Sequence, residues 1–85
     1  MYAVEYTRDA LRSLARMPAN VRALALDKIH LLSLDPRSPH PNVTRLQGRT
    51  EFRLRVQDWR VIYRLEDDRM VLLVIRVGGR GEVYS

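Results

Sequence analysis

The stretch that decides the fold is Phe52-Arg53-Leu54-Arg55-Val56-Gln57-Asp58-Trp59-Arg60-Val61-Ile62-Tyr63-Arg64-Leu65. Its first part alternates apolar and basic side chains, which is the period-two pattern of a β-strand. Gln57-Asp58 then interrupts the pattern, and a second run rich in β-branched and aromatic residues follows. So short a break predicts a hairpin of two antiparallel strands, in which a turn centred on this pair puts Arg55 directly opposite Arg60.

The predicted hairpin has two faces of opposite character. The basic face carries Arg53, Arg55, Arg60 and Arg64, and the other carries Leu54, Val56, Trp59, Val61, Tyr63 and Leu65. Like charges that face each other across two strands destabilise the pair by up to about 1 kcal/mol, so Arg55 and Arg60 need a compensating anion. We interpret the basic face, Arg64 included, as a phosphate-binding surface, to which Arg45 and Arg49 also contribute. The alternative is a solvated face whose arginine stems merely cover apolar surface.

The residues before this stretch predict a strand followed by a helical hairpin. Residues 2–6 alternate as in a strand, and Thr7 is a suitable N-cap for a helix over Arg8–Arg16. Pro18 suits the first turn of a second helix, which Asp35-Pro36 ends. The proline-rich residues 35–42 then predict a loop.

Residues 43–46, 70–77 and 82–84 predict the remaining strands. Residues 70–75 form an unbroken apolar run, which is typical of a central strand covered on both faces. The order of elements predicts an α+β fold: one domain over residues 1–85, with a mostly antiparallel sheet. We expect the two helices on one face of the sheet and the basic residues on the open face.

The composition limits the classes of function. Fifteen Lys and Arg against ten Asp and Glu give a formal charge of +5, which favours a polyanionic partner. The absence of cysteine excludes a disulfide, a thiolate nucleophile and a Cys-based zinc site. His30 and His40 stand alone, so we predict no metal and no other cofactor. With no signal peptide and no apolar run of membrane-spanning length, we expect a cytoplasmic protein that does not contact a membrane.

The glycine-rich segment is Val77-Gly78-Gly79-Arg80-Gly81-Glu82-Val83-Tyr84. It lacks the Walker spacing and the Lys-Ser/Thr ending, which argues against nucleoside triphosphate hydrolysis. Together with residues 52–63 and Leu46-Gln47-Gly48, this segment resembles the RelE/ParE superfamily of bacterial toxins from type II toxin-antitoxin systems. The resemblance extends over essentially the whole chain.

The resemblance is closer to the RelE branch, whose members are ribosome-dependent endoribonucleases that cut mRNA in the A site. It implies a catalytic set of Arg53, Arg55, Arg60, Arg80 and Tyr84. It also implies that the ribosome, mRNA and a cognate antitoxin are partners, the last in a hetero-oligomer. The best-known RelE proteins have lysines where this chain has Arg53 and Arg55, which leaves the general base open between Arg55, Tyr84, Glu82 and the ribosome. The alternatives are a ParE-like inhibitor of DNA gyrase and a catalytically inactive RNA- or ribosome-binding relative.

Overall fold

The computed structural model describes residues 1–79 of the 85-residue chain. Its elements are β1 (Ala3–Tyr6), α1 (Arg8–Arg16), α2 (Ala19–Leu34), β2 (Val43–Arg45), β3 (Phe52–Val56), β4 (Trp59–Glu66) and β5 (Val71–Gly79). The predicted order of strand, two helices and further strands is confirmed. The strand predicted over residues 82–84 lies outside the described residues. Neither helix in residues 1–79 has the length and apolar character needed to cross a membrane.

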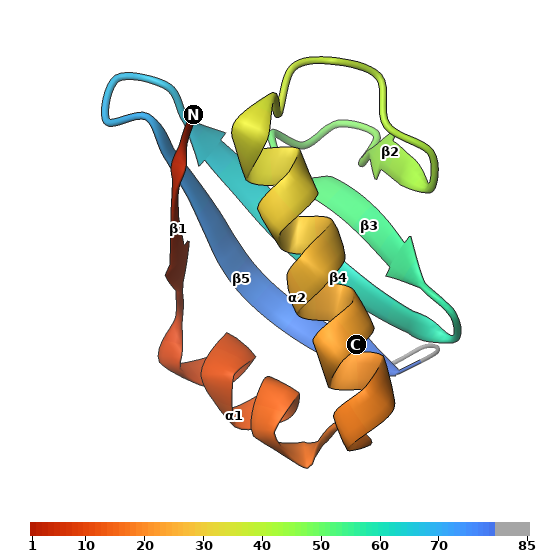
Figure 1. Ribbon diagram of the computed structural model, residues 1–85. Helices are drawn as coiled ribbons and strands as arrows, with labels where there is room; N and C mark the ends of the chain where they lie inside the picture. Colours follow the sequence, from red (N-terminus) through yellow and green to blue (C-terminus); the bar gives the residue numbers. More distant parts are fainter. Residues whose placement is uncertain (80–85) are drawn as a thin grey trace.

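The five strands form one sheet in the order β1-β5-β4-β3-β2. β1 runs parallel to β5, and the other neighbouring pairs are antiparallel. Figure 1 shows α2 lying across one side of the sheet, with α1 near the ends of β1 and β5. The predicted α+β architecture, with both helices on one face, is therefore confirmed.

The helices and the sheet share one hydrophobic core. Leu14 and Ile29 come from the helices, and Leu54, Val61 and Val74 come from the central strands. The rings of Phe52 and Tyr63 stack across β3 and β4 with their centroids 5.3 Å apart. This core uses the apolar face of the hairpin, so the basic face is directed away from the helices.

Thr7 connects the first helix to the middle of the sheet. Its Oγ1 accepts a hydrogen bond from the Ala10 backbone N–H at 3.1 Å, which caps α1 as predicted. The same hydroxyl donates to the Ile75 carbonyl oxygen on β5 at 2.6 Å, and the Thr7 N–H donates to the Val74 carbonyl oxygen. Thr7 therefore attaches the start of α1 to β5.

A β-bulge in β5 changes which side chains reach the open face. Ile62 pairs with Arg76 but Tyr63 pairs with Val74, so Ile75 is the extra residue. Val74, before the bulge, and Val77, after it, are both buried in the core. Ile75 is half-buried and Arg76 is exposed. The prediction that this strand is covered on both faces is therefore wrong, because the bulge turns a basic side chain to the open side.

Candidate nucleic-acid interface

The predicted pairing of Arg55 with Arg60 is confirmed, and it lies beside the two-residue turn of the β3–β4 hairpin. The Arg55 backbone N–H donates to the Asn42 carbonyl oxygen at 2.9 Å, on the side away from β4. The two arginines therefore form a non-hydrogen-bonded pair, the type in which Cα atoms approach to about 4.5 Å and side chains lie closest. The sheet brings two positive charges together at one place on its open face.

These two guanidinium groups have neutral partners. Arg55 Nε donates to the Gln57 carbonyl oxygen at 3.3 Å, and Arg60 Nη1 donates to the Trp59 carbonyl oxygen at 3.3 Å. No carboxylate of residues 1–79 lies within ion-pair distance of either arginine. Each group donates a hydrogen bond to a carbonyl oxygen and has further N–H donors for an external anion, as expected of a phosphate site.

The next row of the open face contains Arg53, Ile62 and Arg76, which are paired across β3, β4 and β5. Ile62 is only 6% exposed although no helix covers this side, as expected if the arginine stems on both sides shield it. The prediction of an entirely basic face is therefore wrong at Ile62. Arg76 was missed because simple alternation assigns it to the same face as Val74, and only the bulge reverses this assignment.

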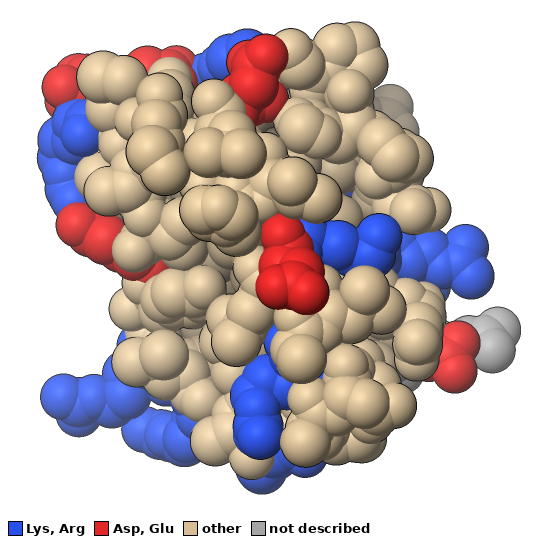
Figure 2. All heavy atoms as spheres, viewed as in Figure 1, with Lys and Arg blue, Asp and Glu red and all other residues tan. Residues whose placement is uncertain are grey.

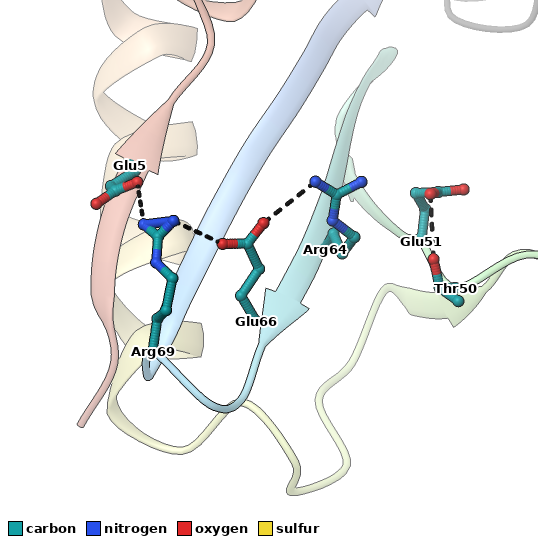
Figure 3. A network of polar contacts seen from close by, with 6 residues as sticks. All are labelled: Glu5, Thr50, Glu51, Arg64, Glu66 and Arg69. Carbon is teal, nitrogen blue, oxygen red and sulfur yellow. Dashed lines mark hydrogen bonds and ion pairs between the residues drawn. The ribbon is translucent and has the colours of Figure 1, made fainter.

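A chain of ion pairs fixes the third row, as Figure 3 shows. Arg64 Nη2 lies 3.2 Å from Glu66 Oε2, and Glu66 Oε1 lies 2.9 Å from Arg69 Nη1. Arg69 Nη2 in turn lies 2.9 Å from Glu5 Oε1 on β1. The hydrogen bond and charge of Glu5, with the charge of Glu66, raise the pKa of Arg69. Arg64 lies on the open face as predicted, and its ion pairs extend through Glu66 and Arg69 to Glu5 on β1.

The remaining predicted phosphate ligands separate from one another. Arg49, in the loop between β2 and β3, lines a pocket with Arg64 on the open face. Arg45 pairs with Phe52 and lies on the helix-bearing face, where its Cζ is 5.9 Å from the Phe52 ring centroid. The structure therefore brings Arg49 to the basic face but not Arg45. Arg80 and Tyr84, with Glu82, lie outside the described residues.

The helix-bearing face has a different charge pattern. Figure 2 views the molecule from this side and shows mostly uncharged side chains, with acidic and basic groups dispersed among them. Several large apolar side chains of the helices are exposed, among them Leu11, Leu31 and Leu34. The paired arginines thus belong to one side of the sheet only.

The family model for the ParE toxin of type II toxin-antitoxin systems matches residues 4–84. The chain belongs to this toxin family. The predicted membership of the RelE/ParE superfamily is therefore confirmed. Among curated proteins, no significant match to this toxin was found.

Solved structures show the same fold for the toxin. The isolated RelE toxin of E. coli is 26% identical with a TM-score of 0.82, over 99% of this chain and 92% of that chain. The intact E. coli RelBE toxin-antitoxin complex gives 24% identity and a TM-score of 0.82, over 96% and 99% of the two chains. The archaeal RelE-RelB complex from Pyrococcus horikoshii gives 24% identity and a TM-score of 0.81, over 95% and 97%.

Proposed function

We propose that this toxin is a ribosome-dependent endoribonuclease that cleaves mRNA in the ribosomal A site, in the cytoplasm. The observation that carries the proposal is the Arg55–Arg60 pair, since two adjacent guanidinium groups have no carboxylate partner among residues 1–79. An RNA phosphate supplies the missing charge. The structural likeness to RelE toxins supports the same choice.

The proposed reaction is a transesterification that requires no metal. The ribose 2′ oxygen loses its proton and bonds to the adjacent phosphorus, while the bond from phosphorus to the 5′ oxygen breaks. The products are a 2′,3′-cyclic phosphate and a 5′-OH end. Arg53 and Arg60 stabilise the extra negative charge of the pentacovalent transition state, because preorganised donors act most strongly where charge develops. Arg80 is the proposed proton donor to the leaving oxygen, and the candidates for the base are Tyr84, Arg55, Glu82 and the ribosome.

An antitoxin is the proposed protein partner. The similar E. coli structure is a RelBE toxin-antitoxin complex, and the similar Pyrococcus horikoshii structure is a RelE-RelB complex. We expect an acidic or amphipathic segment that covers the basic face, folds on binding and forms a hetero-oligomer with the toxin. Carboxylates of that segment would relieve the repulsion between Arg55 and Arg60.

A second candidate function is inhibition of DNA gyrase. It is favoured by the family match, which is to a ParE toxin. In that case the basic face serves binding only, and no RNA is cut.

Mapping of mRNA ends after a short pulse of expression separates the two functions. The wild type is compared with Arg60→Ala and with Arg12→Ala, which removes the same charge from an exposed position on α1. Cuts inside translated codons with 5′-OH ends, lost in Arg60→Ala and retained in Arg12→Ala, are expected. Growth arrest without new ends, accompanied by a loss of DNA supercoiling, refutes the nuclease and supports the gyrase inhibitor.

A further inference from the structure

A pocket of about 360 Å³ opens on the basic face between the β2–β3 loop, β4 and β5. Its apolar lining comes from Leu46, Ile62 and Ile75. Ile75 follows the buried Val74 and faces this side, and the bulge adds Arg76 to the same side. The pocket has the volume of sites that hold small molecules, and apolar side chains suit the flat face of a nucleobase.

The pocket lies next to the paired arginines. Ile62 and Arg60 are two residues apart on β4, which corresponds to about 7 Å along a strand. Arg49, Arg64 and Arg76 surround the apolar surface. A nucleotide adjacent to a phosphate held at Arg60 can therefore place its base against the half-buried Leu46 and Ile75 while its own phosphate contacts an arginine.

Glu51 is the acidic residue of this pocket. Its Oε2 accepts a hydrogen bond from Thr50 Oγ1 at 3.2 Å, and no cation of residues 1–79 lies within ion-pair distance of it. Figure 3 shows that Arg64, which lines the same pocket, is paired instead with Glu66, which is also paired with Arg69. A carboxylate weakens the binding of a bare phosphate, so its presence in the pocket indicates a ligand that also carries N–H donors.

We propose that this pocket binds a guanine base of RNA and that Glu51 is the residue that selects it. The proposal rests on the proposed function, because it requires RNA on the basic face. Guanine presents two adjacent donors, N1–H and the N2 amino group, which match the two oxygens of a carboxylate. Adenine and cytosine present one amino donor beside an acceptor, and the ring N–H of uracil lies between two carbonyl groups that repel a carboxylate.

The test is equilibrium binding of short single-stranded RNAs that differ at one central base, measured by fluorescence anisotropy. The wild type is expected to bind the guanine RNA about tenfold more tightly than the adenine RNA, as one bidentate contact provides. Inosine lacks the N2 amino group and is expected to lie between the two. Glu51→Gln is expected to reduce guanine binding to the adenine level, because an amide offers one acceptor and one donor. Asp68→Asn, the same change at an exposed turn position, should keep the preference.

Each other outcome has a definite meaning. Equal binding of all the RNAs by the wild type overturns the proposal and leaves the pocket to a protein partner. A guanine preference that survives in folded Glu51→Gln overturns it as well. Failure of the proposed function is seen separately, in the mapping of mRNA ends, because growth arrest without new ends refutes the nuclease whatever the base preference measured by anisotropy.

Discussion

Removal of one charge from the Arg55–Arg60 pair should stabilise the toxin. We predict that Arg55→Gln raises the free energy of unfolding, because it ends the repulsion between two residues in direct register. Two charges about 6 Å apart in water repel by about 0.7 kcal/mol, and opposed like charges in sheets cost 0.2 to about 1 kcal/mol. We expect a gain of about 0.5 kcal/mol at low salt, which corresponds to about 2–4 °C in Tm for a domain of this size.

Thermal and urea unfolding at low salt and at about 1 M salt provide the assay, since salt screens exposed charges. Arg60→Gln should give a similar gain, and the double variant should gain about as much as either single variant, because the repulsion is removed only once. Arg64→Gln is the control that should not stabilise, since it breaks the ion pair with Glu66. A gain that is absent at low salt, or unchanged at high salt, refutes the reasoning.

Three further predictions concern the core, a turn and a buried phenol. Leu54→Ala, at a side chain that is 2% exposed, should cost about 2–5 kcal/mol in urea unfolding; a cost below about 1 kcal/mol contradicts its place in the core. Gly48 has φ +71° with open space around it, so Gly48→Ala should lower the free energy of unfolding by about 1–2 kcal/mol and Gly48→Asn by less. Equal stability of the wild type and both variants argues against this turn conformation. Burial raises the pKa of Tyr63 from 10.0 to about 12, so the neutral phenol favours the folded state below pH 10 and this contribution is lost as the pH rises toward 12. Alkaline unfolding followed by circular dichroism should shift to higher pH in Tyr63→Phe, and an unchanged midpoint contradicts the assignment.

The hairpin could be predicted from the sequence because its turn fixes its register. Once Gln57 and Asp58 form the turn, every cross-strand pair follows, including Arg55 with Arg60. The apolar alternation then decides which face packs against the helices. The register of the hairpin and the pairing of Arg55 with Arg60 therefore follow from local pattern.

The rest of the site depends on contacts between distant residues. A bulge leaves no mark in the alternation of an apolar run, so the position of Arg76 on the open face could not be predicted from the sequence. The hydrogen bond from Thr7 to the Ile75 carbonyl oxygen joins residues on β5 and at the start of α1, and it exists only after folding. Glu51 is similar: it lies in one pocket with Arg64, which is paired with Glu66, and the sequence alone does not show this arrangement.

The parallel pairing of β1 with β5 affects the order in which the protein is completed during synthesis. Ala3–Tyr6 has no partner in the sheet until Val71–Val74 has been made, because these residues form its register. The β3–β4 hairpin emerges earlier, but an isolated pair of strands is only marginally stable in water. The basic face is therefore completed late, when almost all of the described chain has been synthesised. A nascent toxin cannot present its finished basic face until that point.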